Sequence, residues 1–358
     1  MIGRDITMRR VEIVDPLRGL AALVVMWFHF TNGSGFIKTA WLRASGKYGW
    51  LGVEIFFVIS GFVIPYSMHC GGYRLRQHFG RFLAKRMVRL EPPYLVSIVL
   101  VIALSYLSSR SPWFAGPPPH FSTAQLLFHM GYLNPFFGYP WLNPVYWSLG
   151  IEFQFYIFVA IVYPFLVARR AVLRILVLAG MVGAAFLIQM PILVFHYLGL
   201  FTLGILAFQH HAELCPRRLL IPMVIIVSAI IAVSVNFPTG LVGGTTALII
   251  VFVPMPQHVA MRVFVFLGRI SYSIYLLHVI IGGRVMNLGS RFNGGLLWEL
   301  GVLAVAIVVT VGAAFGFNLL VERPAQRLSS WIKYSPRQSA AGISPMHEIA
   351  LSAESSEP

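Results

Sequence analysis

The feature that most constrains this chain is a series of long apolar runs separated by short polar or basic segments. Only 11% of the 358 residues are charged, whereas a soluble domain has about 25%. A helix that crosses a bilayer needs about 20 predominantly apolar residues. The sequence therefore predicts an all-α, polytopic membrane protein, a bundle of about ten transmembrane helices. The predicted spans lie near 17–34, 51–68, 93–109, 146–167, 172–190, 193–209, 219–236, 240–254, 265–283 and 296–320.

The Lys and Arg residues indicate the orientation, since cytoplasmic loops carry an excess of them. With the N-terminus inside, all but six of the 27 fall on the cytoplasmic side. The six are Lys38, Arg43, Lys47, Arg110, Arg284 and Arg291. Both termini are therefore expected in the cytoplasm. This topology accounts for the net charge of +15, so no nucleic-acid partner is expected.

Residues 1–334 are expected to form the membrane domain, with the first apolar run retained rather than cleaved as a signal peptide. Residues 335–358 are rich in Ser and Ala and are expected to form a disordered cytoplasmic tail. The long external connection, 111–145, is rich in Pro and aromatic residues and has no Lys or Arg. It predicts either a lid or binding loop, or an interfacial aromatic belt. Cys70 and Cys215 lack metal-binding spacing, so neither a disulfide nor a metal site is expected.

The first apolar run, "DPLRGLAALVVMWFHF" (residues 15–30), carries the ionisable residues Arg18 and His29. Their separation is about three helical turns, so both lie on one face, about 16 Å apart along the axis. Ionisable groups inside a membrane are costly and usually face a protein-lined or watery cavity. Arg18 alone is explained by snorkelling, and His29 alone by a packing hydrogen bond. Together they predict a site that extends from the cytoplasmic surface into the bilayer.

This run resembles the first helix of the acyltransferase family 3 membrane proteins, whose hallmark is Arg-x10-His. Other segments resemble further motifs of that family, in order, between residues 15 and 327. They are "GVEIFFVISGFVI", "RFLAKRMVRLEPPY" with Arg86 and Arg89, "VYWSLGIEFQFY", "HYLGLFTLGILAF", "LGRISYSIYLLH" and "VERPAQR". The family includes O-acetyltransferases of bacterial surface polysaccharides, nodulation-factor acetylases and macrolide acyltransferases. The resemblance therefore implies a location in the inner (plasma) membrane of a bacterial cell.

Two departures from the family pattern are visible. Many relatives have two adjacent carboxylates after W-S-L, whereas this chain has Glu152 followed by Phe153. Any role of the second carboxylate is therefore absent here. The soluble esterase-like domain that some relatives carry after the membrane domain is also not expected, because the tail is too short for it.

The resemblance implies an acyl-CoA donor, most simply acetyl-CoA, as a co-substrate, with no tightly bound cofactor. Basic side chains at the cytoplasmic surface can pair with its phosphates. The residues expected to bind acyl-CoA are Arg18, Lys85, Arg86, Arg89, Arg269 and Ser271. Arg86 and Arg89 have an alternative role as anchors to anionic lipid headgroups, and Ser271 has one in helix packing.

The expected catalytic residues are His29, Glu152 and Glu54. His29 takes the proton of an acceptor hydroxyl as that hydroxyl attacks the thioester carbonyl, and an acyl-His intermediate is a variant of this scheme. Glu54 and Glu152 either orient His29 or the acceptor hydroxyl, or form structural pairs with an arginine such as Arg269. His278 is interpreted as a packing residue.

The predicted function is O-acylation of a lipid-linked or polymeric surface carbohydrate, such as exopolysaccharide or O-antigen. A small-molecule acceptor such as a macrolide is the alternative within the enzyme class. A transporter or a non-catalytic component of glycan export is the alternative outside it. The sequence shows no repeat halves or paired broken helices, which disfavours the transporter.

Overall fold

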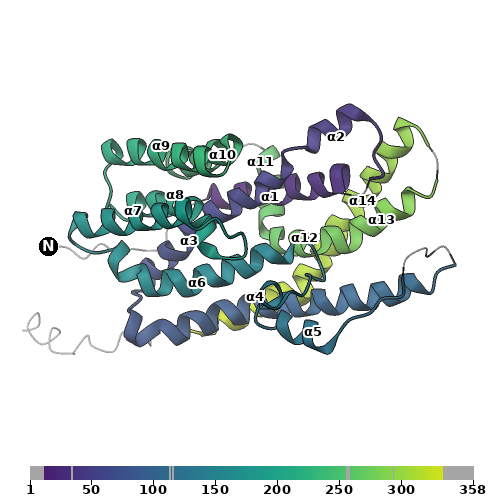
Figure 1. Cartoon of the computed structure of the whole chain (residues 1–358), viewed down its shortest axis with the longest axis horizontal. Helices are drawn as coiled ribbons and strands as arrows, with labels where there is room; N and C mark the ends of the chain where they lie inside the picture. Colours follow the sequence, from purple (N-terminus) through teal and green to yellow (C-terminus); the bar gives the residue numbers. More distant parts are fainter. Residues whose placement is uncertain are drawn as a thin grey trace, which may run out of the picture.

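The computed structural model describes residues 12–33, 35–112, 114, 117–254, 259–292 and 294–333. The described residues form helices and connecting turns without any strand, so the all-α prediction is confirmed. The helices lie side by side along the long axis of the molecule (Figure 1). The α-helices are α1 Val14–Phe28, α2 Ala40–Gly46, α3 Gly52–Cys70, α4 Leu75–Ser109, α5 Thr123–His129, α6 Tyr146–Leu166, α7 Ala171–Leu187, α8 Leu198–His211, α9 Arg217–Ser234, α10 Phe237–Phe252, α11 Val259–Arg269, α12 Ser271–Leu277, α13 Gly283–Gly289, α14 Leu296–Phe317 and α15 Arg323–Trp331.

Short helices of other kinds continue or connect these elements. The π-helical segments are η1 His29–Gly33, η5 His278–Gly282 and η6 Asn318–Glu322. The 3-10 segments are η2 Gly49–Leu51, η3 Asn134–Phe137 and η4 Val194–Tyr197. π-Helices are rare and occur frequently at functional sites.

Helix length and composition identify a multi-pass membrane protein. Within the described residues, five helices are long and apolar enough to cross a bilayer, and a bent pair makes a sixth if it counts as one span. The five are Ala40–Cys70, Leu75–Ser109, Tyr146–Leu166, Arg217–Ser234 and Leu296–Trp331. Each of the ten predicted spans overlaps helical structure, including the short one at 240–254, although the one at 265–283 is divided between two helices. The number of ten spans and the cytoplasmic termini remain predictions.

Helix α4 is much longer than the span predicted at 93–109. Its 35 residues correspond to about 52 Å at 1.5 Å per residue, against a hydrocarbon core of about 30 Å. The helix continues through Pro92 and Pro93, which membrane helices tolerate because neighbouring groups satisfy the freed backbone positions. The basic segment around Arg86 and Arg89 is therefore the first half of this helix, and it continues without a break into the apolar half.

Helices α3 and α8 approach each other until their backbones are in contact. A Cβ atom added to Gly61 would overlap the carbonyl oxygen of Phe201, and one added to Gly204 would overlap that of Val58. Small residues allow membrane helices this close approach. The pair of glycines fixes the position of α3, whose other side chains contribute to the cavity described below.

The span predicted at 265–283 is broken, which the continuous apolar run did not suggest. Its two parts, Met261–Arg269 and Ser271–Gly289, are bent by 65°. At the break, the Asn318 side-chain amide donates to the carbonyl oxygen of Arg269 at 3.4 Å. A Cβ atom on Gly268 would overlap the backbone of Asp15, so α11 ends packed directly on α1. The bend directs α12 into the interior of the bundle.

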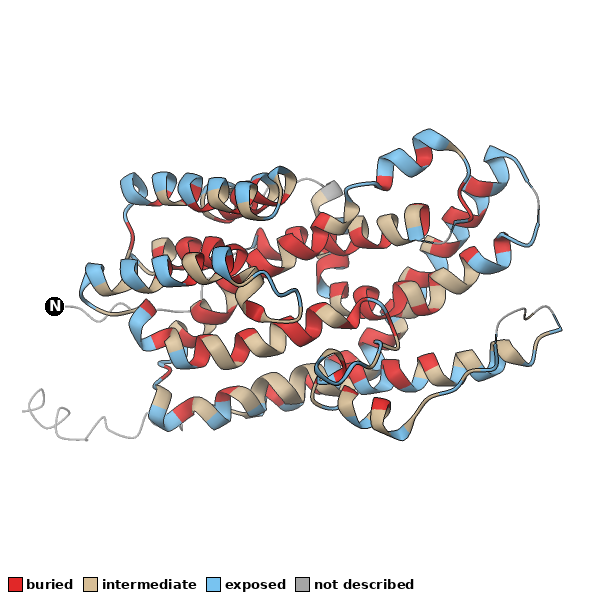
Figure 2. Cartoon of the chain, viewed as in Figure 1, coloured by how far each residue is buried: buried red, intermediate tan, exposed pale blue. Residues whose placement is uncertain are grey.

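Buried residues gather along the centre of the bundle, while the outer faces of the peripheral helices are exposed (Figure 2). Many exposed residues on these outer faces are large and apolar, such as Val233 on α9 and Val308 on α14. Exposed apolar side chains on helices of this length are typical of lipid contact. The polar side chains discussed below lie inside this apolar shell.

Residues 117–145, most of the connection between α4 and α6, pack against α4. Phe128 of α5 stacks on Phe137 at a centroid distance of 4.3 Å. His129 is buried, with Nδ1 2.8 Å from the Tyr94 hydroxyl, and its Nε2 accepts from the backbone N–H of Leu142. Burial lowers the pKa of His129 to about 4. Phe136 and Phe137 are exposed, so both the binding-loop and the aromatic-belt interpretations of this segment stay open.

Candidate active site

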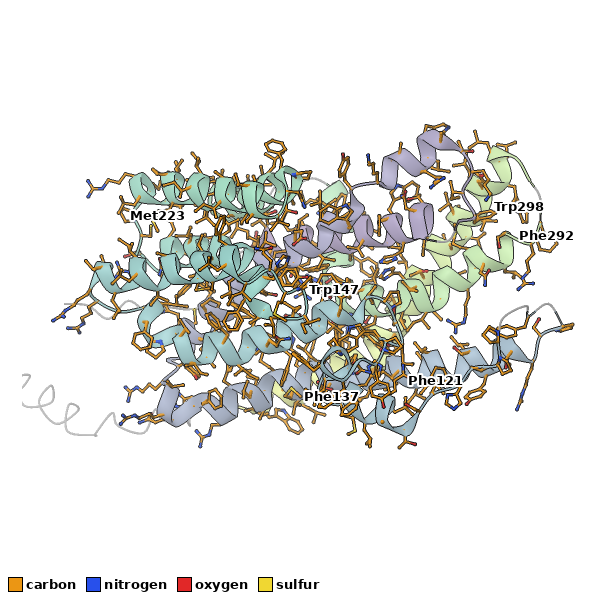
Figure 3. All side chains as sticks on the ribbon, in the orientation of Figure 1. Phe121, Phe137, Trp147, Met223, Phe292 and Trp298 are labelled. Atoms are coloured by element: carbon orange, nitrogen blue, oxygen red, sulfur yellow. The ribbon has the colours of Figure 1, made fainter. Side chains whose placement is uncertain are left out.

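A cavity of about 100 Å3 lies between α1, α3, α4, α6 and α12, with η6 and α15 completing the wall. Apolar side chains, among them Phe56, Phe57 and Leu149, form part of the lining. Trp147 lies in the middle of the bundle in Figure 3, and its ring packs against Phe57. The polar residues of the lining are Arg18, Ser60, Arg86, Arg89, Ser148, Glu152, Tyr156, Ser271, Tyr272, Tyr275, Glu322 and Gln326.

Three arginines from two helices line this cavity. Arg18 comes from the first turns of α1, and Arg86 and Arg89 lie three residues apart on α4, so they share a helix face. Arg86 donates from Nη2 to the Ser67 hydroxyl at 2.8 Å, and its guanidinium lies 5.5 Å from the centre of the Tyr156 ring. The structure therefore brings the three predicted arginines to one place and holds one of them in a defined orientation.

Glu152 of α6 lines the same cavity as these arginines. Its Oε1 atom accepts hydrogen bonds from the Ser60 hydroxyl at 3.2 Å and the Tyr156 hydroxyl at 2.5 Å. Tyr156 lies one helical turn beyond Glu152 on the same helix, so the motif itself provides the second donor. Arg18 is close enough to Glu152 for their charges to interact. The carboxylate is thus held in place by neutral donors while it faces positive charge.

A second carboxylate of the lining, Glu322 at the end of η6, is hydrogen-bonded to three neighbouring side chains. Its Oε2 atom accepts from the Ser273 hydroxyl at 2.5 Å and the Asn318 amide at 2.8 Å. Its Oε1 atom accepts from the Gln326 amide at 2.8 Å. These bonds link α12, η6 and α15, so Glu322 joins the broken helix to the C-terminal helix at the edge of the cavity.

Ser271, the fifth predicted residue in the cavity, begins α12 directly after the break. Its side chain is fully buried, and its hydroxyl has no hydrogen-bond partner in the described part of the structure. Tyr272, next to it, donates from its hydroxyl to the carbonyl oxygen of Leu90 at 2.9 Å. A buried hydroxyl without a partner beside three arginines is a ready donor or acceptor for a bound ligand.

His29 does not line the cavity but lies close behind it. Its ring packs against that of His278, with the centroids 5.1 Å apart. His278 in turn packs against Tyr275 at 5.8 Å, and Tyr275 faces the cavity. Each histidine is the first residue of a π-helical segment, η1 or η5. A chain of three rings therefore connects the cavity with His29.

Three other predicted site residues lie outside the lining. Glu54 is buried in the first turn of α3, where its Oε2 atom has no hydrogen-bond partner among the described atoms. Lys85 is partly exposed on α4, beside Arg86. Arg269 is exposed at the end of α11. The structure thus brings together Arg18, Arg86, Arg89, Glu152 and Ser271 and leaves the others outside the wall.

Sequence reasoning missed two polar residues of this site, Tyr156 and Glu322, and it interpreted His278 as a packing residue. Tyr156 and Glu322 lie in segments that had been singled out as motifs, and the i, i+4 spacing of Glu152 and Tyr156 was visible. Glu322 gave the weaker signal because it adjoins Arg323, which suggests an exposed pair. No group of three or more His, Cys, Asp or Glu residues able to hold a metal ion occurs in the described ranges.

Comparison with known proteins identifies the family. The family model for the acyltransferase domain of acyltransferase family 3 matches residues 11–316. The chain belongs to acyltransferase family 3. The match contains nearly every cavity residue and both histidines, and it ends just before Glu322 and Gln326.

Three relatives of this acyltransferase carry names that describe acyl or acetyl transfer. The chain is 27% identical to the putative membrane-bound transacylase BcsY of Komagataeibacter xylinus, over 83% of this chain and 79% of that protein. It is 23% identical to the putative acetyltransferase ORF330 of Acidianus two-tailed virus, over 75% and 82%. It is 26% identical to the peptidoglycan O-acetyltransferase OatA of Listeria monocytogenes, over 49% and 28%. No solved structure matches this acyltransferase.

Proposed function

We propose that this membrane acyltransferase moves an acyl group, in the simplest case acetyl, from acyl-CoA to a hydroxyl group of a surface carbohydrate. The observation that carries the proposal is the single cavity that is lined by Arg18, Arg86, Arg89 and Glu152. The names of the relatives support the acceptor, since OatA of Listeria monocytogenes is a peptidoglycan O-acetyltransferase. Exopolysaccharide and O-antigen are acceptors of the same class.

The arginines suit the donor. Guanidinium groups form strong, often bidentate hydrogen bonds with phosphate, and acyl-CoA carries several phosphate charges at the end remote from the thioester. In the proposed arrangement, Arg86 and Arg89 hold these phosphates, and the pantetheine arm runs inward past Arg18 and Ser271. Its thioester then lies near Phe56 and Tyr275, whose rings are 5.8 Å apart at the wall closest to the histidines.

The chemistry proposed for His29 is general base catalysis. His29 accepts the proton of the acceptor hydroxyl while that oxygen attacks the thioester carbonyl. The tetrahedral intermediate then expels the CoA thiolate, and His29 returns the proton to it. Glu152 accepts a hydrogen bond from another hydroxyl of the acceptor and so fixes its orientation. General base catalysis of this kind typically contributes about 10²–10⁴-fold.

The orientation follows from the charge pattern. We place both termini in the cytoplasm and the chain in the bacterial inner membrane, with ten helical crossings. The basic half of α4 then reaches the cytoplasm, where acyl-CoA is made, and the folded connection 111–145 lies on the outer side. An acceptor linked to a membrane lipid can approach either side without leaving the bilayer.

Transfer of radiolabel from acetyl-CoA tests this proposal. Membranes containing the wild type or His29→Ala, at matched expression, are incubated with glycan extracts from the host. The expected result is alkali-labile label in glycan with the wild type, at a rate about 10²–10⁴-fold higher than with His29→Ala. Absence of label with every acyl donor and acceptor class tried, small molecules included, would favour a transport or export role. Equal labelling by both proteins would retain the acyltransferase and exclude His29 as the base.

A further inference from the structure

The protonation pattern of His278 can be read from its contacts. The side chain is fully buried, and its Nδ1 atom lies 3.1 Å from the carbonyl oxygen of Ile274. Because a carbonyl oxygen only accepts hydrogen bonds, Nδ1 carries the hydrogen and donates it. In the neutral ring Nε2 is then a bare acceptor. This Nε2 has no hydrogen-bond partner among the described atoms.

A buried acceptor without a donor is costly, and native structures seldom leave one without a reason. Two described polar rings pack against His278, those of His29 and Tyr275. The Tyr275 hydroxyl is already engaged, at 2.6 Å from the Ser148 hydroxyl and 3.2 Å from the carbonyl oxygen of Val145. Of these two rings, His29 is therefore the one that can supply a donor to Nε2.

Each of the two histidine rings that pack together belongs to the first residue of a π-helical turn. His29 begins η1 after α1, and His278 begins η5 after α12. A π-helical turn accommodates an extra residue and redirects the side chains that follow a regular helix. Two such turns, from segments almost 250 positions apart in the sequence, start at the two residues whose ring centroids are 5.1 Å apart.

We propose that His278 is a positioning residue for His29, and this inference rests on the proposed function. As the acceptor hydroxyl attacks the thioester, its O–H bond breaks and the proton moves to one ring nitrogen of His29. The other ring nitrogen of His29 carries a hydrogen and donates it to Nε2 of His278. His278 takes no proton and touches no substrate. It fixes the ring orientation of His29 and stabilises the positive charge that His29 carries until the CoA thiolate takes the proton.

The test compares two substitutions at one position. His278→Phe keeps a ring but has no acceptor, whereas the side-chain carbonyl of His278→Gln can still accept. Losing a hydrogen bond to a charged group predicts a fall in kcat of about 10- to 150-fold for His278→Phe, with little change in the KM for acetyl-CoA. His278→Gln is expected to recover much of this loss.

A matched control is available in His211. Its Nδ1 atom bonds to the carbonyl oxygen of Ala207 at 3.0 Å, four residues earlier, just as that of His278 bonds to Ile274. His211→Phe therefore removes the same local bond away from His29, and its kcat is expected to stay at the wild-type level. Elution and melting temperature in detergent report whether each variant is folded.

Combination with His29→Ala separates a positioning role from a structural one. If His278 acts through His29, the double variant His29→Ala/His278→Phe is no slower than His29→Ala alone. Independent, multiplying losses would overturn the inference, as would a kcat of His278→Phe equal to that of the wild type. A loss in His278→Gln as deep as in His278→Phe, with both variants folded, would also overturn it.

A spectroscopic readout keeps the inference testable if the wild type transfers no acyl group. Nitrogen-15 NMR of histidine-labelled protein is expected to show His278 as the Nδ1–H tautomer. The ring nitrogens of His29 are expected to shift in His278→Gln and to stay unchanged in His211→Phe. An inactive wild type with these shifts would reject the proposed reaction while supporting the histidine pair. Unchanged His29 signals in His278→Gln, or an Nε2–H tautomer of His278, would reject the pair.

Discussion

The hydrogen bond from Tyr156 to Glu152 gives a quantitative test of the cavity. Tyr156→Phe removes one hydroxyl and keeps the ring against which the Arg86 guanidinium packs at 5.5 Å. Glu152 then retains the donor from Ser60, at the longer distance of 3.2 Å, and loses the one at 2.5 Å. The substitution thus isolates one bond to a carboxylate.

The expected loss follows from the energy of such a bond. A hydrogen bond to a charged group contributes about 1.5–3 kcal/mol. One factor of ten in rate corresponds to about 1.4 kcal/mol. If the orientation of Glu152 matters fully in the transition state, kcat/KM for the acceptor falls by about 10- to 150-fold. The KM for acetyl-CoA should change little, because the three arginines are left intact.

The assay is transfer of labelled acetyl to glycan by purified protein in detergent. Tyr163→Phe is the matched control: Tyr163 lies two turns further along α6, with its hydroxyl 3.4 Å from His69 Nδ1, and it does not line the cavity. If Tyr156→Phe loses no more activity than Tyr163→Phe, while both remain folded, Glu152 does not need this donor and the reasoning is refuted.

Three further predictions follow from burial, charge and packing. Gly204→Ala should lower the free energy of unfolding in detergent by about 1–3 kcal/mol through overpacking against α3, and with it the melting temperature. Gly312→Ala, with open space around it, should be neutral or stabilising, and equal melting temperatures of the two variants would argue against the close contact. Arg89→Gln should raise the KM for acetyl-CoA several-fold, and Arg110→Gln, at the opposite end of α4, should not; equal KM values would remove Arg89 from the donor site. Because burial lowers the pKa of His129 to about 4, the unfolded chain binds a proton between about pH 6.5 and 4 that the folded chain does not. The free energy of unfolding should therefore decrease as the pH is lowered from about 6.5 to 4. An equally steep decrease in His129→Gln would show that other groups cause it.

The helices and the family could be predicted because both depend on local sequence. Each apolar run predicts a helix wherever it occurs, since an unbonded backbone is too costly in lipid. The ordered motifs carry the family assignment without any knowledge of contacts. The break after Arg269 could not be predicted in this way, because the donor from Asn318 and the contact of Gly268 with Asp15 come from distant parts of the chain.

The sequence by itself determined the helical, membrane-spanning class and supplied the candidate residues Arg18, His29 and Glu152. It also predicts which side of the membrane carries the basic residues. Only the tertiary structure decided which of these meet. It brings Arg18 and Glu152 to one cavity, and it places His29 behind the wall, against His278. The physical reason is that periodicity fixes which face of a helix a residue occupies. Which faces meet depends on side-chain packing, on glycine contacts and on π-helical turns, and each of these requires partners that are remote in the sequence.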